Sequence, residues 1–154
     1  MRRCAIASYR RPGWFTVHVL NGVVVLAARI GVSLRGTRAL RVRGRATKAW
    51  RTVPVHLLVL DGERYLVAVR GETEWVRNIR VAGEGELVIG RRVEPFVVEE
   101  IADPDKAEIL RAYLRRWGAE VAAFFDGVKA ESPEDELRRI APRHPVFKIV
   151  VPRR

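Results

Sequence analysis

Four cations crowd into residues 43–51, the stretch "RGRATKAWR", which holds Arg43, Arg45, Lys48 and Arg51. Strand-like segments flank this stretch on both sides, so we expect its cations on a short loop rather than along a helix face. Such a loop can aim backbone N–H groups, the Thr47 hydroxyl and several cationic side chains at one place, which suits a phosphate or clustered carboxylates. A solvated hairpin tip has the same composition, so the spacing alone leaves both interpretations open.

The chain carries a formal net charge of +11, and the excess belongs to one part of the sequence. Met1 to Leu60 contains twelve Lys or Arg and no acid, whereas the remaining residues contain seventeen cations against eighteen acids. This asymmetry indicates an anionic partner, either a nucleic acid, a membrane surface or a small anionic ligand. The sequence has no recognised nucleic-acid-binding motif. The high positive charge keeps a basic nucleic-acid-binding module as an alternative function. Because the motif is missing, no nucleic acid partner is expected.

Other chemistries that leave a signature in the sequence are missing. Three histidines, at positions 18, 56 and 144, and the single Cys4 have no metal-ligand spacing, so no metal site is expected. The chain also lacks a GxSxG elbow, a Walker loop and a glycine-rich dinucleotide fingerprint. One cysteine excludes an internal disulfide framework and fits a reducing compartment, so a cytoplasmic location is expected.

The elements that must position the basic loop begin with strands. Strands are expected at 39–44, 51–60 and 64–71, followed by a helix at 72–83 that Gly83 ends. Two further strands are expected within 85–101, joined at Gly90 to Arg92. Pro95 in the second of these indicates an edge position or a bulge.

The last third of the chain is mainly helical. Asp103 is expected to cap a helix that has Pro104 as its first residue and that Gly127 stops. Ser132 is expected to cap a second helix, and 145–151 is expected to form a closing strand. The whole chain, 1–154, is therefore predicted to be one α+β domain with a mainly antiparallel sheet.

Residues 13–34 form the longest apolar stretch and approach the length of a membrane span. His18, Asn21 and Arg29 interrupt it, so we expect a helix that is buried or docked on the surface. The basic start of the chain, "MRRCAIASYRR", makes peripheral contact with an anionic membrane surface a second expectation.

Three blocks of the sequence, "VRGRATKAWRTVPV", "DGERYLVAVRGETEWVRNIR" and "HPVFKI", resemble the deazaflavin-dependent nitroreductase and quinone reductase family. Members of that family use coenzyme F-420 on a split β-barrel. The resemblance covers most of the chain from about Arg43 onward, and it implies a split barrel of about six mainly antiparallel strands with flanking helices. In the family the loop usually reads Gly-Arg-Lys/Arg-Ser-Gly before Arg-Thr-x-Pro. Here Ala46 stands where a cation is common, and Lys48 stands where the glycine usually is.

The resemblance implies that two blocks bind the cofactor. The loop and the strand after it would hold the phosphate through Arg45, Ala46, Thr47, Lys48, Arg51, Thr52, Val53 and Pro54. The second block would flank the deazaflavin ring through Ala68, Val69, Arg70, Gly71, Trp75 and Asn78. F-420 carries a phosphodiester and a polyglutamate tail, so such a cofactor would also explain the cations of the loop. FMN is the alternative cofactor.

By the same resemblance the protein is an oxidoreductase that transfers a hydride from reduced F-420 to a small electron-poor acceptor, such as a quinone, an enone or a nitro compound. Residues 132–147 contain no tyrosine, unlike the corresponding segment of well-studied nitroreductases, so quinones and enones are expected ahead of nitro compounds. Tyr65, Tyr113 and His144 are the candidate proton donors beside solvent. The alternative is a split-barrel protein with FMN or another cofactor. Both a monomer and a homodimer are compatible with the sequence.

Overall fold

The computed structural model describes residues 36–151, so the helix predicted at 13–34 lies outside the described residues. Six antiparallel strands form a closed barrel in the order β1-β2-β3-β6-β5-β4. These strands are β1 (Thr37–Arg43), β2 (Trp50–Leu60), β3 (Glu63–Val67), β4 (Glu84–Ile89), β5 (Arg92–Glu100) and β6 (Val146–Val150). The predicted α+β split barrel with mainly antiparallel strands is confirmed.

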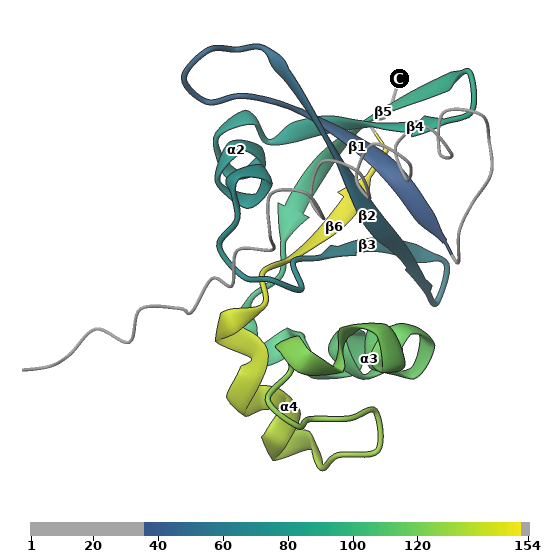
Figure 1. Cartoon of the computed structure of the whole chain (residues 1–154), viewed down its shortest axis with the longest axis vertical. Helices are drawn as coiled ribbons and strands as arrows, with labels where there is room; N and C mark the ends of the chain where they lie inside the picture. Colours follow the sequence, from purple (N-terminus) through teal and green to yellow (C-terminus); the bar gives the residue numbers. More distant parts are fainter. Residues whose placement is uncertain (1–35, 152–154) are drawn as a thin grey trace, which may run out of the picture.

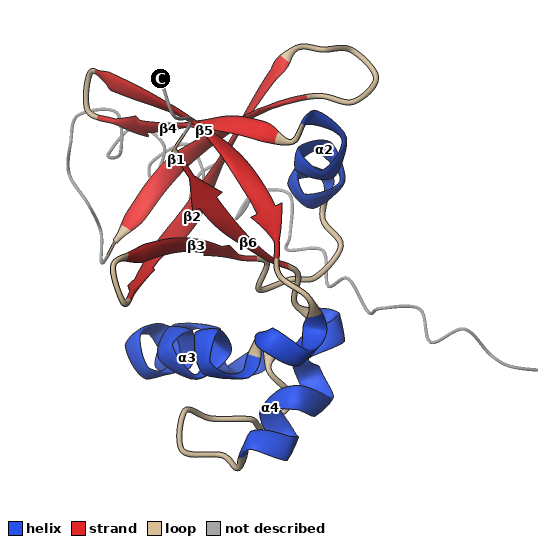
Figure 2. Cartoon of the chain, turned by 180° about the vertical axis from the view of Figure 1, so that it is seen from behind, coloured by secondary structure: helices blue, strands red, loops and turns tan. Residues whose placement is uncertain are grey.

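Three α-helices of the described chain flank the barrel, namely α2 (Glu74–Ala82), α3 (Ala107–Val121) and α4 (Glu134–Ile140). Figure 1 shows α2 beside the barrel, whereas α3 and α4 lie together on a different side of it. The basic loop between β1 and β2 projects from the end of the barrel that α2 flanks (Figure 2).

The barrel interior is filled by alternate residues of the strands, because successive side chains of a strand point to opposite faces. Its large members are at most 1% exposed: Leu40, Leu66, Leu87, Phe96 and Phe147. Val76 and Ile79 of α2 are fully buried in the same cluster, so α2 covers one end of the interior. Each large apolar side chain buried in this way contributes about 1.5–3 kcal/mol, which fixes α2 firmly on the barrel.

A second apolar layer lies outside the barrel wall, between β2, β3 and the pair α3 and α4. Leu58 and Val67 of the strands pack there with Tyr113 and Trp117 of α3 and with Leu137 of α4. The chain therefore has two cores that share the wall formed by β2 and β3.

Two strand predictions can be compared directly with the sheet. The third strand ends at Val67 rather than at Gly71, because the chain turns there: Ala68 N donates to Pro145 O, and Gly71 has a φ of 79°. Pro95 pairs with Glu86 of β4, while β5 pairs with β6 only from Val97 onward. The predicted edge position of Pro95 is confirmed.

The helix boundaries were predicted less well. Helix α2 ends as predicted, with Gly83 as its C-cap. However, Asp103 does not cap α3, which begins at Ala107, because Asp103–Asp105 form a 3-10 turn and the Asp103 carboxylate accepts a hydrogen bond from Lys106 Nζ at 2.6 Å. This helix ends at Val121, well before Gly127, because the chain tightens into a 3-10 turn at Ala122–Phe124.

The Ser132 prediction was also wrong. Its Oγ accepts a hydrogen bond from Lys129 N at 2.8 Å, and Pro133 occupies the N-cap position of α4 without a side-chain cap.

Candidate functional site

The basic loop closes tightly on itself between β1 and β2. Gly44 N donates to Ala49 O at 2.8 Å, and Lys48 N donates to Gly44 O at 2.9 Å. A Cβ at Gly44 would lie 3.1 Å from the Thr47 hydroxyl, so a side chain at this position would displace that hydroxyl by a few tenths of an ångström. Thr47 Oγ1 also accepts a hydrogen bond from Ala49 N at 3.3 Å. The loop is therefore a defined structure rather than a slack connection.

Lys48 has a φ of 60°, a left-handed conformation that costs an L-residue with a side chain energy and that glycine adopts readily. The family that the sequence blocks resemble usually has glycine here. In this chain the loop keeps the backbone conformation that favours glycine while it carries a lysine side chain.

Arg45 joins the loop to α2. Its backbone N and its Nη1 donate to Asn78 Oδ1 at 3.1 and 2.9 Å, and Nη1 also donates to Glu74 Oε2 at 2.8 Å. Asn78 is 5% exposed, so its amide is a fixed acceptor, and the hydrogen bond from Arg45 lowers the pKa of the Glu74 carboxyl. Arg45 is thus paired with α2 and serves to hold the loop in place.

The remaining cations of the loop differ in what they contact. Arg43 donates to Lys48 O at 3.0 Å, and its guanidinium lies 4.1 Å from the centre of the Trp50 ring. The exposed side chains of Lys48 and Arg51 have no ion-pair partner among residues 36–151. Their charges are therefore available to an anion that approaches the loop.

The second predicted block is a turn that leads from β3 into α2. Gly71 N donates to Ala68 O at 3.1 Å, and Thr73 N donates to Gly71 O at 2.8 Å. The φ of 79° at Gly71 and the Arg143 carbonyl oxygen, 3.1 Å from where a Cβ would sit, both favour glycine at this position. Arg70 is exposed, and its guanidinium lies 5.2 Å from the centre of the Phe124 ring.

The first residues of α2 complete this region. Trp75 is half-buried, with its ring centroid 5.8 Å from that of Phe147, so it serves the barrel core at the same time as it borders the turn. Thr73 Oγ1 is buried and has no hydrogen-bond partner among the described residues. An unpaired buried hydroxyl is unusual in proteins, and this one is covered by the chain's own atoms.

The structure therefore brings the two predicted blocks together on α2: the loop bonds to Asn78, and the 68–71 turn runs directly into the helix. The remaining predicted residues of the loop and β2 are exposed or half-buried. Ala46 is exposed at the loop tip, and Thr52, Val53 and Pro54 are half-buried along β2, where they pair with Arg41, Leu40 and Ala39 of β1.

The three candidate proton donors lie in different surroundings. Tyr113 is 1% exposed in the outer core, where its hydroxyl lies 2.8 Å from His56 Nδ1 and burial raises its pKa. Tyr65 is half-buried against the same core. His144 is 3% exposed, and its Nδ1 lies 3.3 Å from Ala68 O, so it contacts the 68–71 turn directly.

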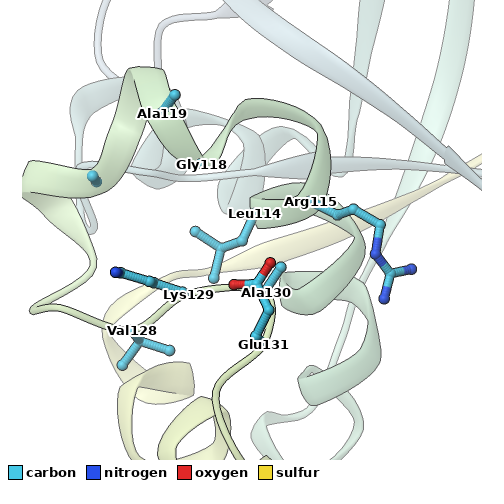
Figure 3. A pocket seen from close by; sticks show the side chains of 9 residues that line it. Leu114, Arg115, Gly118, Ala119, Val128, Lys129, Ala130 and Glu131 are labelled. Carbon is cyan, nitrogen blue, oxygen red and sulfur yellow. The ribbon is translucent and has the colours of Figure 1, made fainter.

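A cavity of about 300 Å³ lies elsewhere, between α3 and the segment that returns along it (Figure 3). Its lining is Leu114, Arg115, Gly118, Ala119, Ala122, Val128, Lys129, Ala130 and Glu131. None of the residues predicted to bind a cofactor is among them, so the two regions are separate. Within residues 36–151 there is no group of three or more His, Cys, Asp or Glu side chains that could hold a metal ion. No helix in that part of the chain is long and apolar enough to cross a bilayer.

Comparison with known proteins decides the family. The sequence model of the F-420H(2)-dependent quinone reductases matches residues 14–129. The chain belongs to this family. It is an F-420-dependent oxidoreductase, as the sequence blocks had implied.

Solved structures share the fold of this quinone reductase family member. An F-420-H2-dependent reductase, FDR-A, superimposes with a TM-score of 0.53 at 16% identity, over 75% of this chain and 95% of that chain. A structure described as a domain-swapped dimer gives a TM-score of 0.56 at 14% identity, over 89% and 97% of the two chains. A protein of unknown function from Agrobacterium tumefaciens gives 0.54 at 14% identity, and this chain spans 54% of it. No curated protein matches the chain significantly.

The residues of this quinone reductase family member fit coenzyme F-420. The exposed cations Lys48 and Arg51 suit the phosphodiester and the carboxylates of its tail. Sequence reasoning missed Glu74, which pairs with Arg45 of the loop. The acid at the first turn of a helix was a visible signal for Glu74, but only the fold shows that it meets Arg45, 29 residues earlier.

Proposed function

We propose that the chain transfers a hydride from reduced F-420 to a small electron-poor acceptor, with quinones and enones preferred over nitro compounds. The observation that carries this proposal is the pair of exposed cations, Lys48 and Arg51, on a loop that Arg45 locks to α2. Such a fixed loop can hold an anionic cofactor without paying for the ordering of the loop at the moment of binding.

The chain's own residues would bind and orient the coenzyme rather than react with it. Lys48 and Arg51 would hold the phosphate and the acidic tail, and residues 68–71 with Trp75 would border the ring. The bound coenzyme supplies the hydride, so no nucleophile or triad is needed in the protein. The barrel core that Trp75 packs against and the buried His144 beside the turn would keep water away from the protein side of the ring.

Fluorescence titration of the purified protein with F-420 and with FMN tests the choice of cofactor. We expect tighter binding of F-420, because the loop offers more cations than the single phosphate of FMN needs. Equal or tighter binding of FMN, or no binding of F-420 at micromolar concentration, would contradict the proposal.

The acceptor is tested by following the oxidation of reduced F-420 with a menadione-like quinone and with a nitroimidazole. The quinone should react faster, because residues 132–147 contain no tyrosine. The opposite order of rates would overturn the acceptor preference and leave the cofactor assignment intact.

A further inference from the structure

Residues 143–145 hold the 68–71 turn at three points. His144 Nδ1 lies 3.3 Å from Ala68 O, and Ala68 N donates to Pro145 O at 2.8 Å. The Arg143 carbonyl oxygen lies against Gly71, 3.1 Å from the position of an added Cβ. The contacts of Arg143 and Pro145 use main-chain atoms, so His144 supplies the contact that a side-chain substitution can remove.

His144 is itself held firmly. Its ring is 3% exposed and stacks on the fully buried Phe125, with a centroid distance of 4.3 Å and an angle of 14° between the ring planes. The neighbouring Arg143 pairs with Asp126, so both sides of the 143–144 peptide are tied to the chain that follows α3. Because the His144 ring is held in place, its Nδ1 can restrict the movement of the Ala68 carbonyl oxygen that it contacts.

The contact also determines which nitrogen of the ring carries the proton. A carbonyl oxygen only accepts hydrogen bonds, so Nδ1 must donate in the bond to Ala68 O. Burial lowers the pKa of His144, which keeps the ring neutral with a single N–H. Ala68 O accepts at the same time from Gly71 N, so His144 acts on the carbonyl that closes the turn.

We propose that His144 is a positioning residue: its Nδ1–H holds the Ala68 carbonyl and thereby keeps the 68–71 turn in the shape that borders the cofactor ring. The placement of the ring beside this turn rests on the proposed function. The role differs from proton donation, because the proton on Nδ1 stays in the bond to the main chain throughout.

Two substitutions at His144 distinguish the effect of the hydrogen-bond donor from the effect of the aromatic ring. His144→Phe keeps an aromatic ring for Phe125 to stack on and removes the donor. His144→Asn places an amide N–H where Nδ1 was and removes the ring. Three measurements are made on the full chain: amide hydrogen exchange of residues 69–73 without cofactor, affinity for F-420 by fluorescence titration, and thermal unfolding.

We expect His144→Phe to speed exchange in residues 69–73 about 2- to 10-fold and to weaken F-420 binding by a similar factor, the size of one neutral hydrogen bond. His144→Asn should stay near the parent in both, although it unfolds at a lower temperature than His144→Phe because the stacking is lost. If the effects came only from general destabilisation, the less stable His144→Asn would show the faster exchange and the weaker binding, which is the opposite of this expectation.

Unchanged exchange in His144→Phe, or effects that follow the order of unfolding temperatures, would overturn the positioning role. Faster exchange in His144→Phe with unchanged F-420 affinity would show that His144 holds the turn but that the turn does not border the cofactor ring. The proposed role of His144 in cofactor binding would then be wrong. If the parent itself does not bind F-420, the proposed function fails, whereas the exchange measurement still decides whether His144 fixes the turn.

Discussion

Lys48 combines two properties that oppose each other. Its side chain carries a charge without an ion-pair partner among the described residues, and its backbone has a φ of 60° that favours glycine. A residue kept in an unfavourable conformation at a binding loop suggests that the side chain is useful there. The backbone conformation of Lys48 therefore lowers stability while its side chain supplies a charge to the loop. The effect on stability and the effect on binding can be measured separately.

Lys48→Ala and Lys48→Gly should both weaken F-420 binding about tenfold, the lower end of what a charge-assisted hydrogen bond contributes, because the side chain is exposed. The variants should differ in stability. Lys48→Gly relieves strain of about 1–2 kcal/mol, less the extra freedom of glycine in the unfolded chain, so it should raise the free energy of unfolding by about 0.5–1 kcal/mol. Urea unfolding and fluorescence titration measure the two quantities.

Ala46→Arg in the Lys48→Gly background is the matched control. It restores a cation where the family usually has one, so it should recover most of the lost affinity while it keeps the gain in stability. If Lys48→Gly binds F-420 as well as the parent does, Lys48 is only a solvated charge and its role must be withdrawn.

At the scale of elements, α2 joins the parts of the candidate site. Arg45 bonds to Glu74 at its start and to Asn78 in its middle, while Arg80 near its end bonds to Glu72 and Glu100 at 2.6 Å each. The Glu100 bond ties the helix to β5. The apolar contacts of α2 with the barrel interior involve neither Arg45 nor Arg80.

Arg80→Met should therefore lower the free energy of unfolding by about 1 kcal/mol, since two partly exposed ion pairs are lost, and leave F-420 affinity within about twofold. Arg77→Met is the control on the same helix, because Arg77 pairs only within the helix, with Glu74 at 3.3 Å, as far as the described residues go. Equal stability of the two variants in urea would show that Arg80 does not tie α2 to the barrel.

How much of this could be read from the sequence depends on the distance over which each feature acts. The strands and α2 follow from local periodicity and from glycine, and they were predicted to within a few residues. The caps at Asp103 and Ser132 were predicted wrongly, because Lys106 and Lys129 N compete for the same oxygens. The contact of His144 with Ala68 spans 76 residues, so no local pattern could indicate it.

At the scale of the whole molecule, the buried His144 and the half-buried His56 make stability depend on pH. Burial lowers the pKa of His56 and of His144 below the usual 6.5. The unfolded chain therefore takes up protons that the folded chain does not, so their contribution is complete above about pH 6.5 and declines as the pH falls below that value. The groups that face them are Glu120 and Arg116 for His56, and Lys106 and Asp126 for His144.

The unfolding temperature should accordingly fall between about pH 7.5 and pH 5.5, and fall less steeply in the double variant His56→Asn with His144→Asn. Thermal unfolding of both proteins across this range measures the difference in slope. Identical slopes would mean that neither histidine is held neutral by the fold.

Two prolines have a consequence for how the barrel meets other chains. Among residues 36–151, β2 pairs with β1 over Trp50–His56 and with β3 over Leu57–Leu60, so Pro54 has one neighbouring strand, as Pro95 has in β5. An incoming strand needs an amide N–H at such a place, and proline has none. Neither stretch can readily extend the sheet into a second molecule, which protects the barrel against aggregation through its strands. At these places, association of two copies through side chains is therefore favoured over a shared sheet.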